Sequence, residues 1–224
     1  KFVEKCNFKG DKIVKEIKRK KFKEFEQLSS VNSGLIKPER IVKELNNLLP
    51  EDTYIIVDPG TPCPYFAAYY KFKKSGRYFL TNRAHGALGY ALPAAIGVQI
   101  AKPKNKTVSI MGDGSFGFAV GELETALRLK LPIIFIVISN SVYGWIKAGQ
   151  KTKFDKRYFS VDFTRTDHFK VAAAFGLKSW KVEKPGDLKK IILQALKYKK
   201  GPCLIDIISQ PLQDANAPVS EWIA

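Results

Sequence analysis

The sequence predicts an α/β protein with a doubly wound, mostly parallel sheet of about six strands and helices on both faces. Short runs rich in β-branched residues alternate with longer helical stretches, which is the pattern of βαβ units. One run, residues 133–138, is apolar throughout, as a central parallel strand covered on both faces requires. Segments rich in Gly, Asp, Asn and Pro follow three of the runs, as expected where strands end in loops.

The individual elements follow from composition and turn chemistry. Strands are expected at residues 54–57, 107–110, 133–138, 178–182 and 203–208. Helices are expected at residues 11–27, 38–49, 84–101, 117–129, 167–175 and 187–198. Pro38 suits a first helical turn, and Pro50 ends the same helix.

The chain divides into two expected parts. Residues 1–34 are interpreted as a basic helical appendage or linker, which could be the tail of a preceding domain. Its apolar residues Ile13, Ile17, Phe22 and Phe25 lie near helical spacing, and a polar linker follows at residues 29–34. Residues 35–224 are expected to form the main domain.

Composition excludes several classes of protein. The longest apolar run, residues 131–138, is far too short to cross a bilayer, and no signal peptide is visible. The three scattered cysteines form no CxxC pair, so we expect reduced thiols in a cytoplasmic protein. The net charge of +17 could attract nucleic acid, but no RNA-binding aromatic signature accompanies it. A solvated lysine surface, or an acidic partner, is the preferred interpretation.

Function is expected in the three loops that follow strands, at residues 58–64, 112–117 and 140–149, because open parallel sheets bind ligands beyond their strands' carboxyl ends. In the second loop, Gly112 and Gly114 allow close backbone approach to a ligand, and a helix follows that could bind phosphate. Asp113 would repel a bare phosphate unless a divalent cation lay between them. The alternative is an ordinary strand-to-helix turn with an aspartate cap.

A second strand end is expected beside this loop. Asn140 lies 27 residues after Asp113, which is one crossover helix and one strand, so the two residues should meet at the sheet edge. Their side-chain oxygens, with the carbonyl of Val142, are the expected magnesium ligands. Gly144 would let the backbone pass a second phosphate.

Gly112-Asp113-Gly114-Ser115, followed one βα unit later by Asn140 and Gly144, resembles the thiamine diphosphate fingerprint. Residues 36–208 as a whole, and residues 86–97 especially, are similar to the C-terminal diphosphate-binding domain of the acetolactate synthase superfamily. The resemblance implies a thiamine diphosphate-binding fold with Mg²⁺, and the catalytic segment of a 2-oxoacid decarboxylase or carboligase. The cofactor would act as the electron sink.

The resemblance also implies roles for single residues. Leu88 would hold the cofactor bent, the backbone of Gly86 and Leu88 would bind its pyrimidine, and Gly60 and Thr61 would approach its diphosphate. Tyr143 and Trp145 could be pocket walls or core residues. The expected cofactor-binding set is Gly60, Thr61, Gly86, Leu88, Gly112, Asp113, Gly114, Ser115, Asn140, Val142, Tyr143, Gly144 and Trp145.

One catalytic group of the superfamily is missing from this chain. The glutamate that activates the pyrimidine belongs to a separate pyrimidine-binding domain, so a partner chain or a longer polypeptide, in a homo- or hetero-oligomer, is expected to supply it. Glu122 and Glu124 are interpreted as surface or capping charges and His168 as structural. His85 could face the site or be a loop histidine, and no other residue is assigned a catalytic role.

Departures from the family pattern leave alternative functions open. Gly149 stands where acetolactate synthases keep a tryptophan, and Thr61-Pro62 replaces a common Gln-His pair. Decarboxylation is therefore better supported than acetolactate synthesis. One alternative is the cofactor-binding subunit of a split sulfopyruvate- or phosphonopyruvate-type decarboxylase. A ferredoxin-linked oxidoreductase subunit would need cysteine clusters. The non-enzyme alternatives are a basic nucleic-acid-binding module and a structural subunit.

Overall fold

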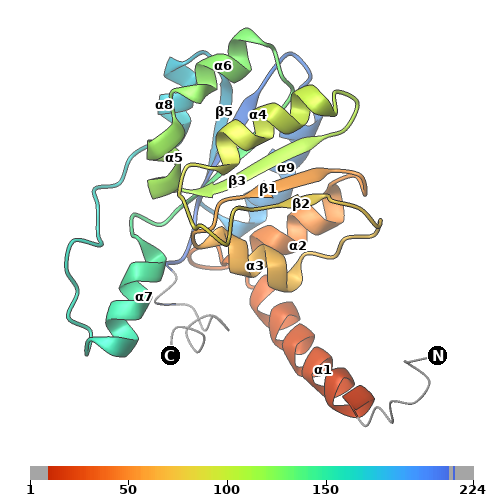
Figure 1. Ribbon diagram of the computed structural model, residues 1–224. Helices are drawn as coiled ribbons and strands as arrows, with labels where there is room; N and C mark the ends of the chain where they lie inside the picture. The colour runs from red at the N-terminus through yellow and green to blue at the C-terminus, as the bar shows by residue number, and fades with distance from the viewer. Residues whose placement is uncertain (1–9, 212–213, 215–224) are drawn as a thin grey trace.

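The computed structural model describes residues 10–211 and 214, and its centre is a six-stranded, all-parallel sheet (Figure 1). The spatial order of the strands is β2-β1-β3-β4-β6-β5. Every neighbouring pair is parallel, which confirms the expected fold class. The strands are β1 (Tyr54–Val57), β2 (Phe79–Leu80), β3 (Thr107–Gly112), β4 (Ile134–Ser139), β5 (Lys178–Val182) and β6 (Cys203–Ile208).

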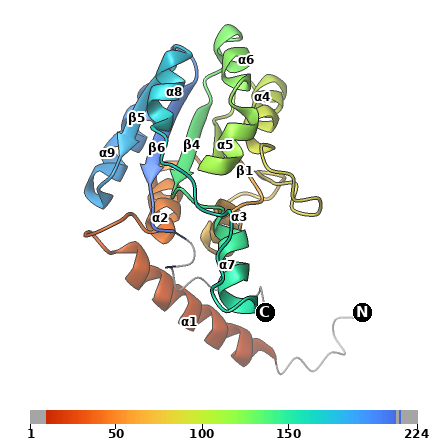
Figure 2. The same cartoon turned by 90° about the vertical axis from the view of Figure 1, so that its left-hand side faces the viewer.

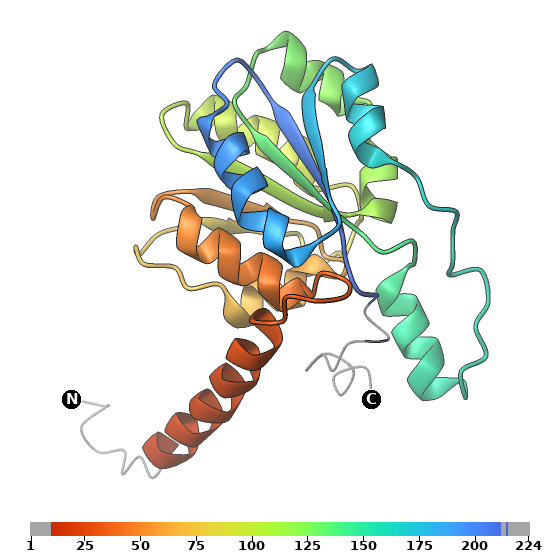
Figure 3. The same cartoon turned by 180° about the vertical axis from the view of Figure 1, so that it is seen from behind.

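Helices cover both faces of the sheet. One face packs against α2 (Pro38–Leu48), α3 (Pro62–Tyr69) and α9 (Leu188–Lys197), and Figure 3 shows α2 and α9 lying across it. The opposite face packs against α4 (Ala91–Ala101), α5 (Asp113–Ala119), α6 (Glu122–Arg128) and α8 (His168–Ala174). A 3₁₀ turn, η2 (Pro185–Asp187), leads into α9, and α1 (Gly10–Ser29) and α7 (Gly144–Lys153) lie toward one end of the molecule (Figure 1).

The central strand β4 shows why the sheet needs both helical layers. Its side chains alternate between the two faces, so Ile134 and Ile136 enter one apolar cluster and Phe135 and Val137 enter the other. All four are buried. A strand that is apolar on both faces loses most of its stabilisation unless both faces are covered, and this fixes β4 at the middle of the sheet.

Several helix boundaries differ from those expected. The helix expected at residues 84–101 begins only at Ala91, because Gly86 and Gly89 have φ values of 75° and 86° and cannot continue a right-handed helix. The single helix expected at residues 117–129 is two helices, and the first begins at Asp113. The expectation of loops throughout residues 58–64 and 140–149 was wrong, since α3 begins at Pro62 and α7 at Gly144. The two-residue strand β2 was not expected.

The basic helix α1 packs on the sheet domain through its C-terminal half only. Phe25 is buried and stacks on Tyr69 with a ring separation of 4.6 Å. At the other end, Ile13 and Ile17 are 62% and 58% exposed, and Figure 2 shows the helix extending away from the domain. Cys6 lies outside the described residues. Among the helices that the structure describes, none combines the length and apolar character needed to span a membrane.

The two-sided burial of β4 predicts the cost of shortening one of its side chains. Ile136→Ala should lower the free energy of unfolding by about 3 kcal/mol, because Ile136 is fully buried and a cavity would remain. Urea denaturation measures this change. Ile17→Ala, at an exposed position of α1, is the matched control and should change stability by less than about 0.5 kcal/mol. Equal effects of the two substitutions would contradict the assignment of the core.

Candidate functional site

The candidate site lies where the strand order reverses. Chain order runs from β1 outward to β2 and then returns to β3 on the other side of β1. Ligands in open parallel sheets bind beyond the strand ends at such a switch point. Asp58 follows β1, Asp113 follows β3 and Asn140 follows β4, so all three expected loops meet at this edge.

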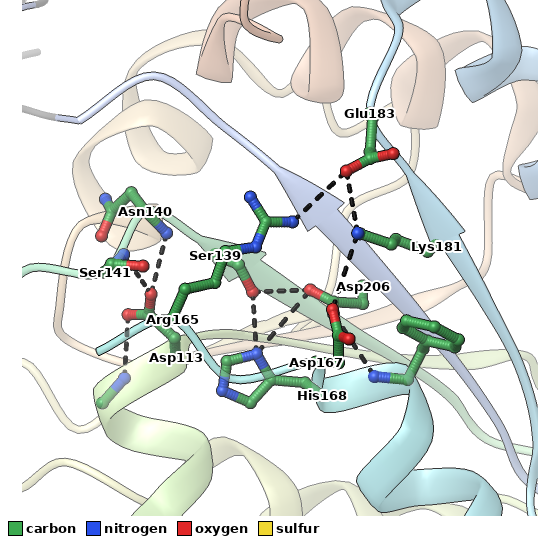
Figure 4. A network of polar contacts seen from close by, with 12 residues as sticks. Asp113, Ser139, Asn140, Ser141, Arg165, Asp167, His168, Lys181, Glu183 and Asp206 are labelled. Atoms are coloured by element: carbon green, nitrogen blue, oxygen red, sulfur yellow. Dashed lines mark hydrogen bonds and ion pairs between the residues drawn. The ribbon is translucent and has the colours of Figure 1, made fainter. Parts of the chain in front are cut away.

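Asp113 joins the ends of β3 and β4 (Figure 4). Its Oδ2 accepts hydrogen bonds from the backbone N–H groups of Asn140 at 2.8 Å and Ser141 at 2.6 Å, and its Oδ1 accepts one from Gly114 at 2.9 Å. Burial raises the pKa of the Asp113 carboxyl, and these three N–H groups and nearby His168 oppose the rise. The two strand ends are thus adjacent, as the 27-residue spacing predicts.

The segment after β4 makes a sharp turn around this carboxylate. Ser141 adopts a left-handed conformation with φ of 57°, and the Asn140 Oδ1 accepts a weak bond from the N–H of Val142 at 3.3 Å. The turn is tied to a later segment, since Tyr143 N–H donates to the Val161 carbonyl at 2.9 Å. The backbone of residues 140–144 is therefore fixed from both sides before α7 begins.

Gly114 is required by close packing against Tyr143. A Cβ atom at position 114 would lie 2.7 Å from the Tyr143 ring, well inside contact distance. Gly60 faces the same space from the β1 loop, since a Cβ there would lie 3.7 Å from Leu88 and 3.9 Å from the Ser115 hydroxyl. Small residues thus keep backbone from two loops within reach of one ligand.

A cavity of about 80 Å³ lies between these loops. It collects twelve of the thirteen expected cofactor-binding residues, all except Gly86, which lies in an exposed turn. His85 is also exposed and is not part of the lining. The sequence did not indicate Ile146. The lining residues are Gly60, Thr61, Leu88, Gly112, Asp113, Gly114, Ser115, Asn140, Val142, Tyr143, Gly144, Trp145 and Ile146.

The loop before α4 is positioned by a buried acid that the sequence did not single out. Asp58 is fully buried and accepts hydrogen bonds from the N–H groups of Tyr90 at 3.2 Å and Ala91 at 3.1 Å. It therefore caps α4 from the end of β1. Burial raises the pKa of Asp58, and the α4 N–H groups oppose the rise. This cap holds Leu88 above Gly60.

A polar network of buried side chains lies beside the site (Figure 4). Ser139 Oγ donates to Asp206 Oδ1 at 2.6 Å, so it accepts from His168 Nδ1 at 3.0 Å. His168 begins α8, as expected, and lines a neighbouring hollow of about 510 Å³ that shares Asp113 with the first cavity. Sequence reasoning did not assign Ser139 or Asp206. Their polarity inside otherwise apolar strands was the available signal.

These features define a class of protein: a doubly wound parallel sheet with an acidic, glycine-rich cavity at its switch point. Comparison with known families matches residues 58–207 to the model described as "Thiamine pyrophosphate enzyme, C-terminal TPP binding domain". The chain therefore belongs to the thiamine pyrophosphate enzymes, as a C-terminal cofactor-binding domain.

Curated relatives give the similarity more detail. The chain is 37% identical over 170 residues to acetolactate synthase of Bacillus subtilis (strain 168), which covers 76% of this chain and 29% of that protein. It is 33% identical over 189 residues to the mitochondrial acetolactate synthase catalytic subunit of Aspergillus candidus, covering 83% and 26%. A probable acetolactate synthase large subunit of Methanococcus aeolicus is 31% identical over 182 residues, covering 79% and 30%. The chain thus spans less than a third of these relatives.

The contact between Gly114 and Tyr143 can be tested with a matched pair of glycines. Gly114→Ala should cost about 1–3 kcal/mol of stability and displace the Tyr143 ring, because the added methyl group meets it directly. Gly117→Ala, in the same helix, meets nothing within 4 Å and should be neutral or slightly stabilising. Urea denaturation measures both. A neutral Gly114→Ala would refute the close approach.

Proposed function

We propose that this chain is the thiamine diphosphate- and magnesium-binding catalytic segment of an acetolactate synthase-like 2-oxoacid decarboxylase or carboligase. The observation that carries the proposal is the position of Asp113. It lies at the switch point, joins two strand ends, and lines the cavity that collects the fingerprint residues. Membership of the thiamine pyrophosphate enzymes supports the identity of the cofactor.

The residues present fit a magnesium diphosphate group. Asp113 is 6% exposed, and within residues 10–211 no lysine or arginine pairs with it. A buried carboxylate without such a partner is stabilised by a metal ion. We infer that Asp113, the Asn140 amide oxygen and the Val142 carbonyl bind Mg²⁺. Diphosphate oxygens would complete the shell, since Mg²⁺ takes few protein ligands.

The other lining residues would hold the organic part of the cofactor. We assign Leu88 to support its ring system, Gly60 and Thr61 to approach the diphosphate, and Tyr143, Gly144 and Trp145 to the wall formed by the start of α7. When bound, thiamine diphosphate supplies the electron sink for loss of carbon dioxide from a 2-oxoacid. The chain's own part is to orient the reactants and exclude water from them.

We further propose that a separate pyrimidine-binding domain supplies the activating glutamate, in a homo- or hetero-oligomer. Glu122 and Glu124 are exposed on α6, and Glu124 pairs with Arg128, so neither lines the cavity. The relatives extend well beyond the matched region, which leaves room for such a domain in them. Cys63 and Cys203 are free thiols, which fits a cytoplasmic setting.

The metal assignment predicts that magnesium and thiamine diphosphate bind together. Calorimetry should show cofactor binding that depends on Mg²⁺, and Asp113→Asn should weaken it at least about tenfold, because the anionic metal ligand is lost. Glu122→Gln also removes one negative charge, but on the exposed surface of α6, and should leave binding unchanged. Unchanged affinity after Asp113→Asn would sink the metal assignment.

The missing glutamate predicts a requirement for a second component. With magnesium, thiamine diphosphate and pyruvate, the isolated chain should release carbon dioxide no faster than the cofactor alone. Adding a pyrimidine-binding partner domain should restore turnover, and product analysis would then separate acetolactate from acetaldehyde. Full activity of the isolated chain would show that the activating acid lies within it.

A further inference from the structure

Arg83 is a cation at the wall of the cavity that the cofactor assignment does not use. It lies in the loop before α4, and its Nη1 donates to the Pro59 carbonyl at 3.0 Å. Its guanidinium carbon lies 4.8 Å from the centre of the Trp145 ring. Trp145 is a lining residue of the cavity, whereas Arg83 is exposed. Arg83 therefore bridges the β1 loop and the start of α7 beside the cavity mouth.

The two contacts leave most of this guanidinium free to bind an anion. An arginine has five N–H donors, and only one is used by Pro59. Among the residues that the structure describes, no carboxylate forms an ion pair with Arg83. Stacking on Trp145 orients the planar group, so less side-chain freedom is lost when it binds an oxyanion.

Charge balance indicates what the free donors would bind. In the described part of the chain, the cavity lining contains one charged side chain, Asp113, and no lysine or arginine. A diphosphate and an acid substrate would add further negative charge, which a single Mg²⁺ offsets only in part. A cation at the wall would therefore favour entry of an anionic substrate.

The chemistry of decarboxylation decides which anionic group suits a fixed guanidinium. The reacting carboxylate leaves as neutral carbon dioxide when its bond to the carbonyl carbon breaks, so its charge is lost from that position. A guanidinium held on it would stabilise the bound substrate more than the transition state and would slow the reaction. A second anionic group keeps its charge throughout, so binding it lowers both states equally.

We propose that Arg83 is a specificity-determining residue that binds the non-reacting anionic group of a 2-oxoacid carrying two acidic groups. The inference rests on the proposed function and narrows its substrate class. Trp145 is the positioning residue that keeps the guanidinium at the cavity wall. Carboxylate, sulfonate and phosphonate tails share the oxyanion chemistry that a guanidinium recognises.

The test uses two unreactive amide analogues that differ by one carboxylate. Oxamate imitates a 2-oxoacid with one acidic group, and N-oxalylglycine imitates one with two. Each is titrated calorimetrically into the chain saturated with magnesium and thiamine diphosphate. The wild type should bind N-oxalylglycine more tightly, and Arg83→Gln should weaken that binding at least about tenfold while changing oxamate binding less than about twofold.

Two further variants separate recognition from structure. Arg83→Lys keeps the charge but loses the planar stack on Trp145, so N-oxalylglycine binding should fall between wild type and Arg83→Gln. Arg77→Gln removes another exposed arginine, in the loop before β2, and should change neither affinity. Thermal unfolding confirms that each variant is folded.

The outcomes distinguish this inference from the proposed function. Equal weakening of both analogues by Arg83→Gln would assign Arg83 to the reacting carboxylate and overturn the proposal. Unchanged binding of both, or no preference for N-oxalylglycine in the wild type, would also overturn it, while cofactor binding in the same titrations would leave the proposed function standing. Failure of the wild type to bind the cofactor would overturn both.

Discussion

The carboxylate of Asp113 is the interaction on which the rest of the site depends. It is buried at the end of β3, and it receives N–H groups from Gly114 on its own helix and from Asn140 and Ser141 at the end of β4. Burial of an acid is unfavourable unless its oxygens are satisfied, so these bonds hold the two strand ends in one arrangement. The turn that exposes Asn140 and Val142 follows from that arrangement.

Two features surround this carboxylate and give the cavity its shape. Glycines at positions 60 and 114 allow Leu88, Ser115 and Tyr143 to approach closely, and Asp58 fixes the start of α4 on the opposite loop. The result is a hollow lined mainly by backbone and apolar groups around one acid. Such a site suits a ligand that brings its own charge and reactive atoms, as the proposed cofactor does.

Local sequence patterns predicted the sheet and the core of the site, and long-range contacts account for what they missed. Strand β4 is apolar at every position, and the spacing from Asp113 to Asn140 is one βα unit, so both could be placed from the chain alone. Helix α7 and strand β2 depend on tertiary partners. Ser139, His168 and Asp206 are 29 and 67 residues apart along their hydrogen bonds, and no local pattern joins them. Arg83 gains its meaning only through Trp145.

The central claim is that Asp113 and Asn140 hold a divalent cation against the cofactor's diphosphate. Its most direct test is a crystal structure of the chain with thiamine diphosphate and Mn²⁺ in place of Mg²⁺, with the ion located by its anomalous scattering. The account predicts one Mn²⁺ within coordination distance of an Asp113 oxygen, the Asn140 side-chain oxygen and the diphosphate. A cofactor bound in this cavity with the ion elsewhere, or with no ion at Asp113, would contradict it.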